Sequence, residues 1–160
     1  VGYEAGAKYI NPDIQVETIF AGDFEDPAKG KESALALYAK DIDIVFQVAG
    51  KTGEGVFEAA KDTGKFAIGV DSDQRYINPD AIIASMIKGV DISIYETIEK
   101  IQKGEFESGN VYEYGAKENG VRIAYGTEDM PKLVSDEAMN QIQELTAMII
   151  QGDIEVPEAN

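Results

Sequence analysis

A glycine-rich turn follows an apolar stretch in the first third of the chain. The stretch Ile42–Gly50 is nearly all apolar, and Lys51, Thr52 and Gly53 follow it directly. Gly-Lys-Thr after a strand is how a phosphate-binding loop ends, with the lysine on the phosphates and the threonine hydroxyl on magnesium. The complete motif needs a glycine where Val45 stands, and without it the backbone cannot make the wide turn that encircles phosphates. The turn is therefore either a tight strand-to-helix connection or one that also lets a ligand reach backbone N–H groups at a helix N-terminus.

Other residues with suitable chemistry end apolar stretches elsewhere in the chain. Asp71 ends "FAIGVD", Lys88 ends "AIIASMIK", and Phe20 lies near the end of "IQVETIFAG". The carboxyl ends of parallel strands meet at one edge of a sheet, where ligands collect. A carboxylate there can accept hydrogen bonds from vicinal hydroxyls, an ammonium can donate to a carbonyl or ring nitrogen, and an aromatic ring can stack on a planar base. Each residue also has a plain structural explanation, as a cap, a solvated strand end or a core residue.

Composition excludes several classes of function. The chain has 160 residues, 30 acidic against 14 basic side chains and a net charge of −16, which repels nucleic acid. It has neither cysteine nor histidine, so it lacks disulfides, Cys/His zinc sites and the usual general base. No catalytic constellation is visible. We therefore expect a binding protein without cofactor, metal or enzymatic activity; the alternative is a phosphate-loop hydrolase that uses Lys51, Thr52 and Asp71.

Local signals predict alternating helices and strands. Asp26 is a candidate N-cap before Pro27, and Gly64 closes a short helix. Helices are predicted over 1–10, from 27, over 55–64, over 90–103 and over 135–152. Strands are predicted over 14–22, 42–50, 65–71 and 81–87, followed by a hairpin whose turn is Lys117–Gly120. The fold class is α/β, with a Rossmann-like parallel sheet flanked by helices and a C-terminal hairpin and helix.

The sequences of several segments resemble those of the basic membrane protein family, purine nucleoside receptor type. These are lipid-anchored substrate-binding proteins of ABC importers. The segments are "GYEAGAKYINPDIQV", "AGDFEDPAKGKESALALY", "DIVFQVAGKTGEGVFEAAK", "AIGVDSDQ" and "SMIKGVDISIYETI". The resemblance runs over essentially the whole chain and implies a lobe of a type I periplasmic-binding-protein fold, with 1–160 as the C-terminal lobe of a two-lobed protein.

The resemblance also assigns roles to the candidate residues. It implies that Phe20 is the aromatic residue that stacks on the base, with Phe24 or Phe46 as substitutes. Gly50 is then a backbone contact, Asp71 the ribose carboxylate and Lys88 the base donor. Position 51 departs from the family, because a small residue is expected there and this chain has a lysine.

Location and partners follow from the same resemblance. It implies an extracytoplasmic protein held at the cell membrane by an N-terminal lipid, a purine nucleoside as ligand, and an ABC permease and ATPase as partners. The alternative within the family is a sensor that binds a sugar or another small ligand without a transporter. The chain does not begin with methionine and reads as a piece of a longer protein. Residues 81–103 are expected to cross a hinge toward the other lobe. Ile94, Ile98 and Ile101 would then lack their partner, so we expect this surface either to be covered by self-association or to be unusually mobile.

Overall fold

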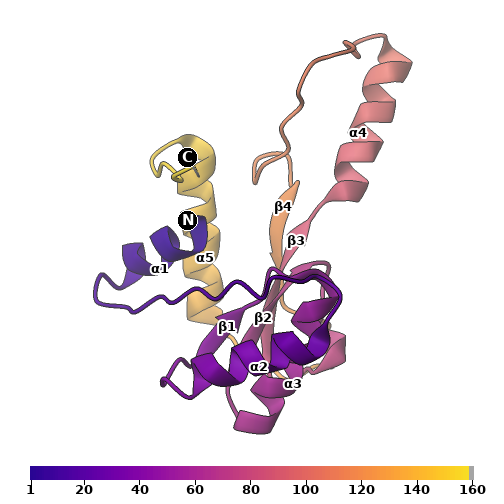
Figure 1. Cartoon of the computed structure of the whole chain (residues 1–160). Coiled ribbons are helices and arrows are strands. Elements are labelled where there is room, and N and C mark those ends of the chain that lie inside the picture. The colour runs from indigo at the N-terminus through magenta and orange to yellow at the C-terminus, as the bar shows by residue number, and fades with distance from the viewer. Residues whose placement is uncertain (159–160) are drawn as a thin grey trace. The chain divides into compact units, whose positions relative to one another are not determined.

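The computed structural model describes residues 1–158, which divide into two compact units. One unit comprises Val1–Phe20 and the residues from Asp136 onward, and the other comprises Ala21–Ser135. The first contains α1 and α5, and the second contains the sheet with α2, α3 and α4 (Figure 1). The helices are α1 (Gly2–Ile10), α2 (Pro27–Tyr38), α3 (Gly53–Thr63), α4 (Val90–Lys103) and α5 (Asp136–Gln151); the strands are β1 (Ile44–Phe46), β2 (Phe66–Asp71), β3 (Ile82–Lys88) and β4 (Val121–Ala124).

The sheet of the second unit is mixed. Within the described residues its four strands lie in the order β1-β2-β3-β4, with β1 to β3 parallel and β4 antiparallel to β3. The register between β2 and β3 shifts by one residue after Ala67. This irregularity places Asp71 opposite Ile87, so the ends of the two strands are level and Lys88 follows directly. The parallel part of the prediction is confirmed.

Helices α2 and α3 pack together against the sheet. Their contact is close because a Cβ atom on Gly55 would lie 1.9 Å from the carbonyl oxygen of Pro27, which only glycine avoids. The same holds for Gly30, whose Cβ would lie 1.9 Å from the carbonyl oxygen of Thr52. The core cluster comprises Ala34, Leu37, Tyr38, Val45, Val56, Phe57, Ala59, Ala60, Ala67, Ala81 and Ile82.

The predicted helix ends are confirmed in this unit. The Asp26 carboxylate accepts hydrogen bonds from the backbone N–H groups of Ala28 and Lys29, with Pro27 in the first turn. Gly64 ends α3 in the left-handed conformation, with φ of 66°. These ends depend on neighbouring residues in the sequence, which is why local signals locate them.

The predicted strand over residues 14–22 is wrong. That segment has no strand in the structure, although its β-branched composition favours one. A strand exists only where a neighbouring strand completes its backbone hydrogen bonds, and composition does not indicate whether an edge is available.

The predicted hairpin is also wrong, although its turn forms. The backbone N–H of Gly120 donates to the carbonyl of Gly115 at 2.9 Å, and Asn119 adopts a left-handed φ of 58°. Only the second arm is a strand, and it pairs with β3. The first arm contacts α4 instead. Its residue Tyr112 has the Lys100 ammonium of α4 at 5.5 Å from the centre of its ring.

Helix α4 continues the chain from β3 away from the sheet (Figure 1). The amphipathic helix was predicted here, and it is confirmed. No residue of α4 is buried, and Ile94, Ile98 and Ile101 are each about half exposed. The helix contacts the segment after it, because the Lys100 ammonium lies 5.5 Å from the centre of the Tyr112 ring and 5.8 Å from that of Tyr114.

The other unit contains helices α1 and α5, both predicted from the sequence. In α1 an ion pair joins Glu4 and Lys8 one turn apart. Gly2, at the start of α1, lies close to Val156, in the residues that follow α5. Across residues 1–158, none of the helices is long and apolar enough to cross a membrane.

Candidate functional site

Asp71 and Lys88 come together at the carboxyl edge of the parallel strands. The Lys88 Nζ atom lies 3.0 Å from a carboxylate oxygen of Asp71, and both side chains are more than half exposed. Asp71 has a φ of 67°, a left-handed conformation that is uncommon outside glycine and is tolerated best by Asn and Asp. Uncommon backbone conformations of this kind cluster at ligand sites. The sequence-predicted carboxylate and ammonium therefore form one polar centre.

Gly50 and Phe24 form a neighbouring pair on the turns that follow β1 and precede α2. Gly50 has a φ of 56°, and a Cβ atom there would lie 3.2 Å from the carbonyl oxygen of Phe24. That carbonyl accepts a hydrogen bond from the Thr52 backbone N–H. Phe24 is 67% exposed. Of the aromatic residues proposed from the sequence, the structure thus places Phe24 beside Gly50.

The other two aromatic candidates belong to other segments of the chain. Phe20 is the last residue of the α1–α5 unit and is exposed. Phe46 is the final residue of β1 and is half-buried.

The turn after β1 is a tight connection and does not have the shape of a phosphate loop. Gly50–Thr52 forms a single 3₁₀ turn that leads directly into α3. The Thr52 side chain is fully buried, and its hydroxyl accepts a hydrogen bond from the Asp26 backbone N–H at 2.9 Å. A hydroxyl held in this way cannot coordinate magnesium. The geometry argues against the hydrolase alternative.

A polar network connects the ends of β1, β2 and β3 behind this edge. The Gln47 amide donates to the Gln74 side-chain oxygen at 2.8 Å, and that oxygen also accepts from the Val70 backbone N–H. The backbone N–H of Gln74 donates to the Ser85 hydroxyl at 3.0 Å. Gln47 and Ser85 are buried. The network fixes the turn that follows Asp71.

Arg75 fastens the segment after β4 to the same turn. Its guanidinium is buried and donates to the carbonyl oxygens of Ile82, Pro79, Pro131 and Tyr125. Asp73 completes the connection, because its two carboxylate oxygens accept from the backbone N–H groups of Arg75 and Gly126. The sequence contained no signal for this connection, because its partners are 50 to 56 residues apart.

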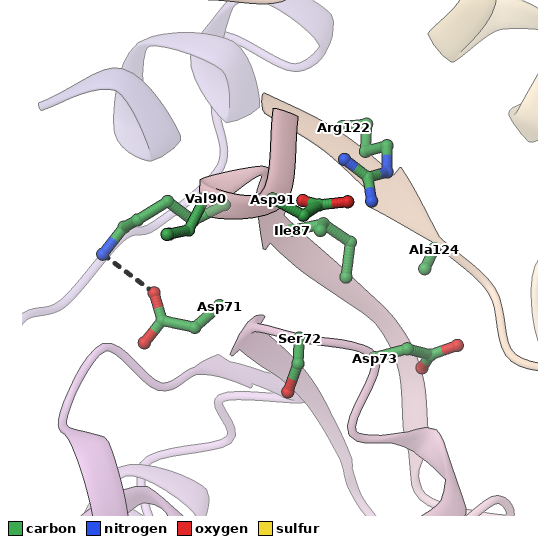
Figure 2. Close-up of a pocket in the computed structure, with 9 residues that line it drawn as sticks. Asp71, Ser72, Asp73, Ile87, Val90, Asp91, Arg122 and Ala124 are labelled. Atoms are coloured by element: carbon green, nitrogen blue, oxygen red, sulfur yellow. Dashed lines mark ion pairs between the residues drawn. The ribbon is translucent and has the colours of Figure 1, made fainter. Parts of the chain in front are cut away.

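A cavity of about 600 Å³ surrounds the Asp71–Lys88 pair (Figure 2). It is lined by Asp71, Ser72, Asp73, Ile87, Lys88, Val90, Asp91, Arg122 and Ala124. Sequence reasoning missed Asp91 and Arg122. Asp91 lies three residues after Lys88 and could have been found as a polar residue at a strand end, whereas Arg122 reaches the cavity only because β4 pairs with β3. The described residues contain no group of three or more acidic side chains placed to bind a metal ion.

Comparison with known proteins identifies the family. A family model described as ABC transporter substrate-binding protein, PnrA-like, matches residues 1–160. The chain belongs to this family. Basic membrane protein A of Borreliella burgdorferi is 40% identical over 160 residues, which cover 98% of this chain and 46% of that protein. The CD4+ T-cell-stimulating antigen of Listeria monocytogenes is 32% identical over 173 residues, covering 98% of this chain and 47% of the antigen.

This PnrA-like chain spans about half the length of the curated relatives it matches. Among solved structures, a solute-binding protein of an ABC transporter from Aeropyrum pernix K1 superposes with a TM-score of 0.79 at 26% identity. The match covers 99% of this chain and 53% of that protein. A Bacillus halodurans protein described as a transcriptional activator of the comK gene superposes with a TM-score of 0.78 at 29% identity, covering 96% of this chain and 52% of the activator. The predicted periplasmic-binding-protein fold is confirmed.

Proposed function

We propose that this chain carries part of the ligand site of an extracytoplasmic ABC-importer receptor, and that the ligand is a purine nucleoside. The observation that carries the proposal is the Asp71–Lys88 pair, which offers an acceptor and a donor 3.0 Å apart at the edge where parallel sheets bind ligands. Asp71 accepts hydrogen bonds from the two ribose hydroxyls, and Lys88 donates to the base. The family membership supports the receptor role.

The exposure of the Asp71–Lys88 pair suits a binding site in which a ligand replaces the contact between the two side chains. An exposed ion pair stabilises a protein by only about 0–1 kcal/mol, so little stability is lost when a ligand inserts between the two groups. Each hydrogen bond to a charged group contributes about 1.5–3 kcal/mol once water is excluded. Gly50 offers its backbone, and Phe24 supplies a ring that stacks on the base. Binding is then driven by closure of the site around the ligand.

The rest of the proposal concerns the whole protein. The chain supplies the C-terminal lobe of a two-lobed receptor, and residues 81–103 lead across the hinge to the other lobe. Exposure of the isoleucine side chains of α4 supports this, because a second lobe would cover them. An N-terminal lipid holds the receptor at the cell membrane, where it delivers its ligand to a permease and an ATPase.

Titration calorimetry on the protein at its full natural length tests the ligand. We expect guanosine, inosine or adenosine to release heat without magnesium, and ribose alone to release none. Asp71→Asn should weaken nucleoside binding about 10- to 100-fold, because a charged acceptor is lost. Asparagine tolerates the same left-handed backbone, so the fold is preserved.

The matched control is Asp41→Asn. Asp41 has a φ of 63°, is exposed and does not line the cavity, so the variant should bind like the wild type. Absence of heat with every nucleoside would refute the proposed ligand. A requirement for magnesium and a triphosphate would instead favour a nucleotide hydrolase.

A second candidate is a receptor that senses a sugar or another small ligand without transporting it. The likeness to the Bacillus halodurans protein described as a transcriptional activator favours this candidate. Heat from a pentose or hexose in the same titrations, with none from nucleosides, would support it.

A further inference from the structure

The cavity contains a second acidic and basic pair beside the Asp71–Lys88 ion pair. Arg122 on β4 and Asp91 in the first turn of α4 both line it. Figure 2 draws both side chains at the upper right of the cavity, away from Asp71. The Arg122 guanidinium donates one hydrogen bond, to the carbonyl oxygen of Asn119 at 3.2 Å, and within residues 1–158 neither Arg122 nor Asp91 forms an ion pair. Most of the donors and acceptors of this second pair are therefore open to a ligand.

The carboxylate of Asp73, the third in the cavity, is already engaged in hydrogen bonds. Both oxygens of Asp73 accept backbone hydrogen bonds, from Arg75 at 3.1 Å and from Gly126 at 3.0 Å. Asp73 thus belongs to the structural connection described above. Among the charged side chains that line the cavity, Asp91 is then the remaining carboxylate and Arg122 the remaining cation for the part of a ligand that extends past Asp71 and Lys88.

We propose that Arg122 and Asp91 form a second subsite that selects a 6-oxopurine over a 6-aminopurine base. This inference rests on the proposed function. A guanidinium only donates hydrogen bonds, and its planar fork matches the two acceptors O6 and N7 of guanine or hypoxanthine. An ionised carboxylate only accepts, and N1–H of the same bases is a donor.

Adenine presents the opposite pattern on this edge. Its 6-amino group is a donor that would face the donors of Arg122, and its N1 is an acceptor that would face the carboxylate of Asp91. Desolvating these groups without partners weakens binding. A bidentate arginine contact discriminates between bases by roughly 5- to 150-fold, and the partial exposure of Arg122 places the expected ratio near the lower end, about 10-fold.

Titration calorimetry with guanosine, inosine and adenosine tests the inference on the full-length protein. The wild type should bind guanosine and inosine about 10-fold more tightly than adenosine. Arg122→Met should reduce this preference by weakening the binding of guanosine and inosine while leaving adenosine affinity within about twofold. Asp91→Asn should also reduce the ratio of guanosine and inosine affinity to adenosine affinity. Lys117→Met, which removes one exposed positive charge outside the cavity, should leave it unchanged.

The outcomes separate this inference from the proposed function. Nucleoside binding with the same preference in wild type and Arg122→Met would overturn the inference and leave the proposed function standing. Absence of nucleoside binding by the wild type would overturn both. If Arg122→Met does not fold, Arg122→Lys replaces it: lysine keeps the charge but lacks the planar fork, so the preference should fall, and an unchanged preference would again overturn the inference.

Discussion

Replacing the buried Arg75 by methionine should lower the free energy of unfolding by about 3–5 kcal/mol. Arg75 is only 2% exposed, and its guanidinium donates to the carbonyl oxygens of Ile82 at 2.6 Å, Pro79 at 2.7 Å, Pro131 at 2.6 Å and also Tyr125. Hydrogen bonds from a charged donor contribute about 1.5–3 kcal/mol each, so the set would total about 6–12 kcal/mol. Burying the positive charge costs several kcal/mol, which reduces the net loss to the stated range.

Urea unfolding of wild type and Arg75→Met, followed by circular dichroism, measures this change. Hydrogen exchange supplies the local measurement, because the Gly126 amide should exchange faster once residues 125–131 are released from the sheet. Arg122→Met is the matched control: this side chain is only partly buried and makes one hydrogen bond, so stability should change by less than about 1 kcal/mol. A loss below about 1 kcal/mol in Arg75→Met, with unchanged exchange at Gly126, would refute the reasoning.

Two smaller predictions concern packing and pH. Gly55→Ala should destabilise the protein by about 1–3 kcal/mol in urea unfolding, because its Cβ would lie 1.9 Å from the Pro27 carbonyl oxygen. The control is Gly6→Ala in α1, whose Cβ meets nothing within 4 Å and which should stabilise the protein by about 0.5–1 kcal/mol. Equal effects of the two variants would contradict the close contact of α2 with α3. Burial raises the pKa of Tyr38, whose hydroxyl donates to the Phe66 carbonyl at 2.8 Å. Because the folded state favours the neutral phenol, this stabilisation is complete below the ordinary pKa of about 10 and is lost as pH rises toward the raised value. From pH 9 to 11 the free energy of unfolding should therefore fall more steeply in the wild type than in Tyr38→Phe. Parallel curves for the two proteins would contradict this role of Tyr38.

Half of the candidate site could be predicted from the sequence. Asp71 and Lys88 each end an apolar stretch, and parallel strands bring such ends to one edge, so their meeting follows from the pattern. Arg122 could not be predicted, because its place depends on β4 pairing with β3 instead of with the segment before the turn. The choice of Phe24 as the aromatic neighbour of Gly50 also required the structure, since the two belong to turns that meet only after α2 packs on α3.

The sequence by itself determined the features that depend on near neighbours. The cap at Asp26, the left-handed end of α3 at Gly64 and the turn at Asn119 all follow from residues within a few positions of one another. Tertiary structure alone decided which segments became strands and where the buried guanidinium of Arg75 found its carbonyl partners. The physical reason is that a strand or a buried charge is stable only when distant backbone groups satisfy its hydrogen bonds, and no local pattern records which distant groups those are.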